Sequence, residues 1–190
     1  VSVDGLDVVR FPEEVLQRVG MVFQDADSQI VGETVREDVA FGPENLGLSP
    51  AEVEQRVESA LEMTGIAHLA EKSCHLLSGG EKRRVAVAGV LAMQPRVVVF
   101  DEPFANLDYP GVRQVLREIL KLHEKGRTIL VTTHDIEKVV AHVDRIAVIH
   151  KGELKAMGAP REIVPVLASF DVRPPRCAVA GEGFSSWLED

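Results

Sequence analysis

The feature that most constrains the fold of this chain is an alternation of short apolar runs with longer segments of helical pattern. The runs have the length and the β-branched content of strands, and they lie at 19–23, 96–100, 128–132 and 145–149. Near-continuous apolar strands are typical of parallel sheets that helices cover on both faces. The sequence therefore predicts an α/β fold with a mostly parallel sheet and helices on both faces.

Helix signals fill the segments between these runs. Ser49 and Glu52 form a capping-box pair ahead of a helix over 50–64, and Gly65 follows it as a stop. Ser78 and Glu81 repeat the pattern before an apolar helix over 79–93. The remaining expected elements are helices over 12–18, 110–125, 135–142 and 160–167, and a strand over 153–157.

Composition excludes several classes of protein. The 190 residues carry 30 acidic against 21 basic side chains, and a net charge of −9 disfavours a sequence-independent electrostatic grip on nucleic acid. The longest run without a charged residue, 85–95, has 11 residues and is too short to cross a bilayer. Cys74 and Cys177 lie far apart, without zinc or disulfide spacing. No secretory signal is visible, so the sequence predicts a soluble cytoplasmic protein.

Paired carboxylates follow the apolar run at 97–100. A strand that ends in Asp101 and Glu102 places these acids at the carboxyl edge of the sheet, where ligands bind in open α/β folds. Asp101 is a suitable oxygen ligand for Mg²⁺. Glu102 points elsewhere and is suited to orient or deprotonate a water that attacks a phosphate. The alternative is a solvated strand end, at which both acids only face water.

Two adjacent glycines open the helix predicted over 79–93, in the sequence Leu77-Ser78-Gly79-Gly80-Glu81. Glycines allow backbone N–H groups to approach a ligand closely, and a helix N-terminus favours an anion. The alternative is that Ser78 and Glu81 simply cap the helix. Because capping requires no double glycine, the two interpretations are compatible.

Five segments of the chain resemble, in order, the motifs of the ATP-binding-cassette (ABC) ATPases. Gln24 matches the Q-loop residue, residues 77–81 resemble the signature motif, and residues 97–102 resemble the Walker B strand. Residues 105–108 resemble the D-loop, and His134 matches the switch histidine. Each match alone is weak, but five in this order within 111 residues make coincidence negligible.

The resemblance implies a fold and a set of roles. The fold is that of the P-loop NTPases, as an ABC ATPase domain over 1–167 with a helical signature subdomain at about 33–93, followed by a loosely ordered tail over 168–190. The implied ligands are ATP and Mg²⁺, bound between two subunits that pair head to tail. The implied residues are catalytic Glu102, His134 and Gln24, nucleotide-binding Ser78, Gly79, Gly80, Glu81 and Asp108, and metal-binding Asp101 and Gln24.

A subfamily is implied as well. Residues 22–47 and 88–93 are similar to the cobalt and energy-coupling-factor (ECF) importer ATPases. These work as homodimers or heterodimers beneath a membrane-embedded coupling subunit, which implies a peripheral protein at the cytoplasmic face of the membrane. The implied function is to power uptake of cobalt, nickel or a vitamin, with no nucleic-acid partner. Within residues 25–45, Glu37 and Asp38 are expected to belong to the docking surface for the membrane subunit. The alternative is that this segment is a small amphipathic subdomain packed against its own core.

One motif of the family is not found. The phosphate loop G-x-x-x-x-G-K-[ST] brings amides and a Lys to the phosphates, and this chain has no Gly-Lys dipeptide. The nearest match by spacing, residues 42–49, lacks the Lys and follows no predicted strand. We therefore expect a truncated domain without the central Walker A strand and helix, with two opened strand edges and no ATPase activity alone. The alternatives are a non-hydrolysing partner that offers only its signature motif and, less favoured, a non-transport ABC ATPase.

Overall fold

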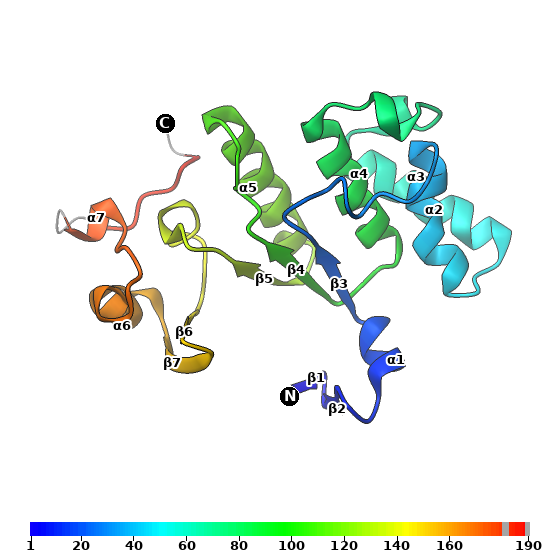
Figure 1. Ribbon diagram of the computed structural model, residues 1–190. Helices are drawn as coiled ribbons and strands as arrows, with labels where there is room; N and C mark the ends of the chain where they lie inside the picture. The colour runs from blue at the N-terminus through cyan, green and yellow to red at the C-terminus, as the bar shows by residue number, and fades with distance from the viewer. Residues whose placement is uncertain (180–182, 189–190) are drawn as a thin grey trace. The chain divides into compact units, whose positions relative to one another are not determined.

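The computed structural model describes residues 1–179 and 183–188 of the chain (Figure 1). It divides into two compact units, and each is described by itself. The first comprises Val1–Ala105 and Lys121–Thr132, and the second comprises Asn106–Leu120 and Thr133–Asp190.

A parallel sheet forms the centre of the first unit. Its strands are β3 (Val19–Val22), β4 (Val97–Asp101) and β5 (Thr128–Thr132), in the order β3-β4-β5. In the register of the sheet, Val22 lies opposite Phe100, and Asp101 lies opposite Thr132. Val98 and Phe100 of the middle strand are almost fully buried, as the apolar runs of the sequence predict. The prediction of an α/β fold with a parallel sheet is confirmed.

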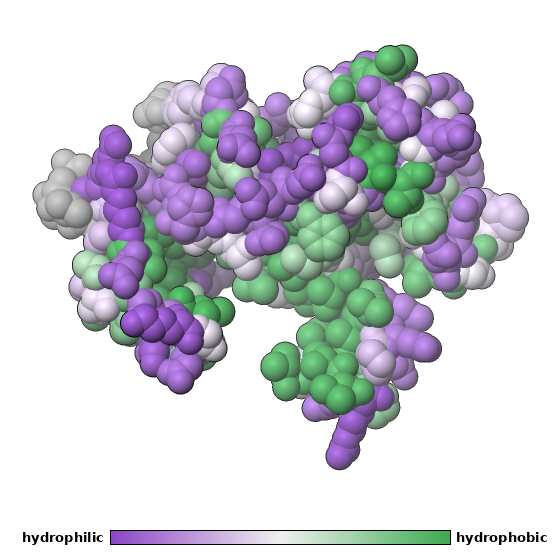
Figure 2. Space-filling model, viewed as in Figure 1, coloured by the Kyte–Doolittle hydropathy of each residue, from purple (hydrophilic) through white to green (hydrophobic). Residues whose placement is uncertain are grey.

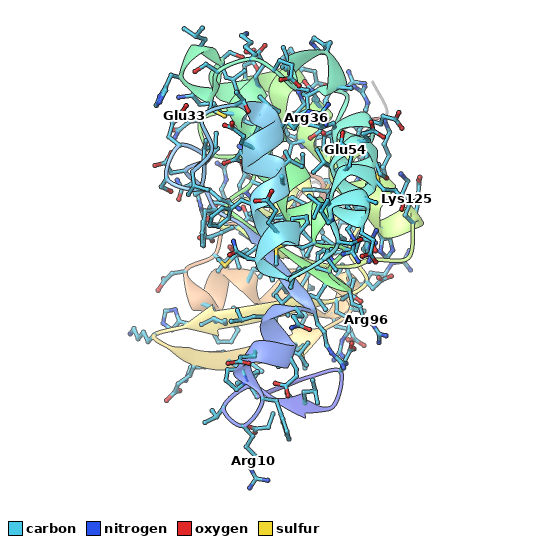
Figure 3. All side chains as sticks on the ribbon, turned by 90° about the vertical axis from the view of Figure 1, so that its right-hand side faces the viewer. Arg10, Glu33, Arg36, Glu54, Arg96 and Lys125 are labelled. Atoms are coloured by element: carbon cyan, nitrogen blue, oxygen red, sulfur yellow. The ribbon has the colours of Figure 1, made fainter. Side chains whose placement is uncertain are left out.

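Three helices pack together beside this sheet: α2 (Val35–Asn45), α3 (Pro50–Thr64) and α4 (Gly79–Ala92). Two short 3₁₀ turns, Ala67–Leu69 and Cys74–Leu76, lie between α3 and α4. At the surface, Arg36 of α2 bonds Glu54 of α3 at 2.5 Å and Glu71 at 2.9 Å (Figure 3). These helices all lie within the residues proposed above as a helical subdomain.

Capping boxes set where the three helices begin. Ser49 and Glu52 exchange hydrogen bonds at the start of α3, and Gly65 ends that helix with a φ of 70°. A third box, Thr34 with Glu37, begins α2. The sequence pattern did not lead us to expect a helix over these residues. Residues 42–45 belong to α2, so the best match to a phosphate loop does not lie between a strand and a helix, which supports its rejection.

Close packing joins α4 to the sheet. A Cβ atom at Gly20 of β3 would lie 2.3 Å from Cγ1 of Val90 and 3.0 Å from Cγ of Pro95, so only glycine fits this position without a shift. This contact fixes the C-terminal half of α4 against the start of β3. The N-terminus of α4, which carries the two glycines, lies at the other end of the helix.

The first residues of the chain form β1 (Ser2–Val3), β2 (Leu6–Asp7) and the short helix α1 (Pro12–Leu16). Figure 2 shows an apolar surface over this segment. Its exposed apolar side chains are Val1, Val9, Phe11 and Leu16.

The second unit has its own small core. The strands β6 (Ile146–His150) and β7 (Glu153–Gly158) pair antiparallel, followed by α6 (Pro160–Ile163) and the 3₁₀ helix η4 (Val164–Phe170). The core side chains are Val140, Ile146, Val148, Ile163, Val164 and Leu167. The helix α5 (Tyr109–Glu124) begins in this unit, and α7 (Arg176–Val179) lies in the tail. The proposed loosely ordered tail partly falls on residues 180–182 and 189–190, outside the described residues.

The prediction of a helix over 135–142 is wrong. Only the 3₁₀ turn η3 (Ile136–Lys138) forms there. The backbone leaves helical geometry at Val139, where φ is −124° and ψ is −15°. Val139 and Val140 are both buried. Tertiary packing of two β-branched residues therefore outweighs the local helical pattern.

Among the described residues, β5 pairs only with β4, and β6 pairs only with β7. None of the helices in the described part of the chain combines the length and the apolar character that crossing a membrane requires.

Candidate functional site

Asp101 is held at the carboxyl edge of the sheet by its neighbour across the ladder. It is the last residue of β4, and its Oδ1 accepts a hydrogen bond from the Thr132 hydroxyl at the end of β5. This bond restricts the carboxylate while leaving lone pairs of both oxygens for a ligand. Sequence reasoning missed Thr132, although a hydroxyl residue at the end of the next apolar run was the available signal.

Glu102 leaves the strand in a left-handed backbone conformation, with a φ of 43°. Its N–H donates to the Thr132 carbonyl at 3.0 Å, and its own carbonyl accepts from the Ala105 N–H at 3.1 Å. These two bonds define a sharp turn directly after Asp101. Non-glycine residues with such φ values cluster at functional sites, where the surrounding structure holds the strain.

Gln24 lies at the same edge as the two acids. It follows β3 by two residues, and the parallel register sets the end of β3 beside the end of β4. The Gln29 side chain holds the following loop against β3, since it accepts from Phe23 N–H and donates to the Met21 carbonyl, each at 3.0 Å. The Gln24 side chain is exposed. The structure thus brings together three of the predicted site residues: Gln24, Asp101 and Glu102.

The signature segment begins α4 through a complete capping box. The Ser78 N–H donates to Glu81 Oε2 at 2.7 Å, and the Glu81 N–H donates to Ser78 Oγ at 3.3 Å. In the same turn, Lys82 forms an ion pair with Asp27 from the loop after Gln24. The capping interpretation of Ser78 and Glu81 is therefore confirmed. The ion pair ties the start of α4 to the loop that begins at the sheet edge.

Packing within the chain does not account for the two glycines. A Cβ atom at Gly79 would meet nothing within 4 Å, and one at Gly80 would approach only the end of the Arg84 side chain, at 3.9 Å. Both φ values are negative. Glycine is a weaker helix former than Ala, and no close contact among the described residues requires it here. A backbone left bare and exposed at a helix N-terminus suits close approach by an outside ligand.

The capping box predicts a pH dependence of stability. The Ser78 N–H, followed by the Ser78 hydroxyl and Lys72, lowers the pKa of Glu81 from its ordinary value of 4.5. A pKa lowered on folding gives stability that is present above the unfolded pKa and is lost as pH falls through the folded pKa. Glu81→Gln is therefore expected to lower Tm at pH about 7, with a difference from wild type that shrinks below pH about 4.5. Thermal unfolding across pH checks this, and a constant difference would contradict it.

Asp108 and His134 lie in the second unit. Oδ1 of Asp108 accepts from the Gly111 N–H at 3.0 Å and so caps the start of α5. His134 is exposed and lines a cavity of about 430 Å³ with residues of the tail, including Arg173, Arg176 and Trp187. Asp108 thus has a structural role in α5 that is compatible with the contact proposed for it.

The burial of Asp38 argues against its expected role in docking, whereas Glu37 is exposed. Asp38 is 7% exposed, and its Oδ1 accepts from the N–H groups of Val31 at 2.7 Å and Gly32 at 3.0 Å. The Glu37 side chain closes the capping box by accepting from the Thr34 N–H at 2.9 Å. Asp38 therefore holds the segment together from inside, and Glu37 caps α2 at the surface. The exposed apolar residues of the segment are Val31, 62% exposed, and Phe41, 53% exposed.

The donors at the sheet edge fit Mg²⁺ in part. Among the described residues, no three His, Cys, Asp or Glu side chains gather as a metal site. Mg²⁺ commonly binds through one or two carboxylates together with substrate phosphates and waters, rather than in an all-protein cage. One restrained carboxylate, Asp101, with the amide of Gln24 at the same edge, matches that mode.

Comparisons with known proteins agree with this arrangement. The ABC transporter family matches residues 1–105. The chain is 46% identical over 168 residues to an energy-coupling factor transporter ATP-binding protein, EcfA, of Methanocaldococcus jannaschii, covering 87% of this chain and 60% of that protein. It is 49% identical over 156 residues to a cobalt import ATP-binding protein, CbiO, of Syntrophus aciditrophicus, covering 81% of this chain and 55% of that protein.

A solved structure extends the agreement to the fold. CbiO1 of Clostridium perfringens, described as part of the ABC transporter complex CbiONQ, superposes with a TM-score of 0.78 at 36% identity, covering 95% of this chain and 74% of that one. The chain spans about 60% of the length of the curated relatives it matches. Because the family match covers more than half of its residues, the chain belongs to the ABC transporter family, with ECF and cobalt import ATP-binding proteins among its relatives.

Proposed function

We propose that the chain is part of the ATP-binding subunit of an ECF or cobalt-type importer, in which ATP hydrolysis drives uptake. The observation that carries the proposal is the bare glycine pair at the start of α4, where a Cβ atom would meet no close neighbour among the described residues. The restrained Asp101 beside Glu102 supplies a separate site of the required chemistry. Two separate sites of this kind suit a pair of subunits that share nucleotides across their interface.

The residues at the sheet edge have separate roles in phosphoryl transfer. Asp101 and Gln24 would hold Mg²⁺, which when bound neutralises charge on the phosphates. Glu102 orients the attacking water and accepts its proton as the water oxygen bonds to the γ-phosphorus and the bond to the β–γ bridging oxygen breaks. His134 contacts the γ-phosphate. Ser78, Gly79 and Gly80 approach the γ-phosphate bound by the partner subunit, with Glu81 holding their helix start and Asp108 linking the two sites.

The partners proposed are a second ATPase subunit, identical or different, and a membrane-embedded coupling subunit. Val31, in the loop after Gln24, and Phe41, on α2, are exposed apolar side chains, and we assign the docking surface to them in place of the buried Asp38. The proposed location is the cytoplasmic face of the membrane. The proposed cargo is a metal ion, cobalt or nickel, or a vitamin, and cobalt import is named for one relative.

A second candidate function is a non-hydrolysing partner that offers only its signature segment. The 190 residues contain no G-x-x-x-x-G-K-[ST] sequence. The loop supplies several charge-assisted hydrogen bonds of about 1.5–3 kcal/mol each. The loss of three would weaken nucleotide binding by roughly three to six orders of magnitude.

Titration with a fluorescent ATP analogue in the presence of Mg²⁺ tests the proposal. The 190-residue chain is expected to show no micromolar binding, because the amides and Lys of the loop are not in it. The same chain joined to a preceding strand and G-x-x-x-x-G-K-[ST] loop from a relative is expected to bind at micromolar concentrations and to release phosphate. Micromolar binding by the chain alone would contradict the account of the loop. Binding without turnover by the extended protein would favour the non-hydrolysing partner.

A further inference from the structure

A basic cavity lies in the first unit, at the opposite edge of the sheet from Asp101. Its volume is about 190 Å³, and its polar lining comes from Arg56 and Ser59 of α3, Gln94 after α4, Lys125 after α5, and Arg127. Gln94 and Arg127 directly precede the segments that enter β4 and β5. Strands rise about 3.3 Å per residue, so a five-residue strand separates the cavity from the catalytic edge by roughly 15 Å.

Two arginines of the cavity are fixed by backbone carbonyls. An Arg127 Nη1 donates to the Pro95 carbonyl at 2.6 Å and to the Gln94 carbonyl at 3.3 Å. Arg56 Nη1 lies 3.5 Å from the Met93 carbonyl, at the end of α4. Each guanidinium has five N–H donors, so these bonds orient the groups and leave donors for another acceptor. The two side chains are thus preorganised, which lowers the entropy cost of binding a ligand.

The positive charge in the cavity exceeds what the fold around it neutralises. Arg56, Lys125 and Arg127 bring three full charges, and none of the described residues that line the cavity is acidic. The C-terminal ends of α4 and α5 face the same region and contribute about half a negative charge each. About two positive charges remain, in a chain whose net charge is −9. Capping of helix ends therefore does not account for the whole cluster.

We propose that this cavity binds a small phosphate-type dianion, either inorganic phosphate or a compact phosphorylated metabolite. Two fixed guanidiniums and an ammonium match the oxygens of a doubly charged tetrahedral group, and Ser59 adds a hydroxyl. The volume is below the 300–1,000 Å³ typical of pockets for drug-sized ligands, which favours a small anion. Lys125 lies at the end of α5, beside α3 (Figure 3).

Phosphate binding to the 190-residue chain, without nucleotide, tests the proposal. Isothermal titration with inorganic phosphate is compared with sulfate and succinate at constant ionic strength set by chloride. The variant Lys125→Gln removes one charge from an exposed side chain, so it leaves the fold intact. Its matched control is Lys121→Gln, which makes the same charge change one turn earlier on α5, outside the lining of the cavity.

Wild type and Lys121→Gln are expected to bind phosphate with the same Kd, and Lys125→Gln at least about tenfold more weakly, since a charge-assisted bond is lost. Sulfate should compete, and succinate should not. Equal weakening by both variants would show general charge attraction and overturn the proposal. The proposal would also be overturned if titration with phosphate gave no more heat than titration with chloride, or if succinate bound as tightly as phosphate. Because no nucleotide is present, failure here leaves the proposed ATPase function untouched.

Discussion

Replacing Glu102 with Gln is expected to slow ATP turnover at least about a hundredfold while leaving MgATP binding intact, in the chain joined to a phosphate loop. Gln keeps the size of the side chain but cannot accept the proton of the attacking water, and a general base contributes about 10²–10⁴ in rate. Glu102 is placed for this role by the turn directly after Asp101, with its N–H bonded to Thr132. Phosphate release and analogue titration measure the two quantities.

A control variant with the same change of charge at another position separates the loss of the general base from a change in overall charge. Glu13→Gln removes the same charge from an exposed position on α1 and should leave turnover unchanged. If Glu102→Gln kept half of the wild-type turnover, Glu102 would have no catalytic role. If both binding and turnover fell together, the substitution would have damaged the site as a whole.

The second large effect is expected at Asp38, on stability. Asp38→Leu removes the acceptor of two hydrogen bonds from Val31 and Gly32, and each unmet N–H costs about 1–3 kcal/mol. The free energy of unfolding should therefore fall by about 2–6 kcal/mol. Asp38→Asn keeps an oxygen at Oδ1 and should lose less than half of that. Urea unfolding of the 190-residue chain measures both variants.

The close approach of the loop to α2 at Gly32 leaves no room for another hydrogen-bond partner in the Asp38→Leu variant. A Cβ at Gly32 would lie 2.3 Å from the Asp38 backbone nitrogen, so the loop passes too close to α2 for another partner to enter. Equal losses for Asp38→Leu and Asp38→Asn would mean that packing, and not hydrogen bonding, holds the loop. An unchanged stability in both would return Asp38 to the docking surface expected from the sequence.

The sequence predicted those elements whose local signals agree with their final environment. The helix over 50–64 has a cap at each end and appears with the expected bounds. The apolar runs at 97 and 128 form the expected parallel strands, although β5 leaves one face exposed, with Leu130 53% exposed. The helix α2 was missed because Pro43 lies inside it, although Thr34 and Glu37 carry the same capping signal as Ser49 and Glu52.

The site shows a similar division. Asp101, Glu102 and Gln24 were predictable as neighbours, because they follow apolar runs that meet at one edge of a parallel sheet. The structural role of Asp38 was not predictable, because an acidic residue next to another acidic residue in a polar segment is ordinarily exposed. Its burial depends on a loop that returns to the helix from Val31 and Gly32, a contact that no local pattern encodes.

The backbone conformation at Glu102 is unfavourable for the glutamate that occupies this position. With a φ of 43°, glutamate is held in a region that glycine adopts freely, at a cost of order 1–3 kcal/mol. Selection for a stable fold alone would therefore place glycine there, and the carboxylate would be lost. Because glutamate occupies this position, part of the stability that the rest of the domain provides offsets the backbone strain. An extended, active protein therefore tolerates fewer further destabilising substitutions than its core would otherwise allow.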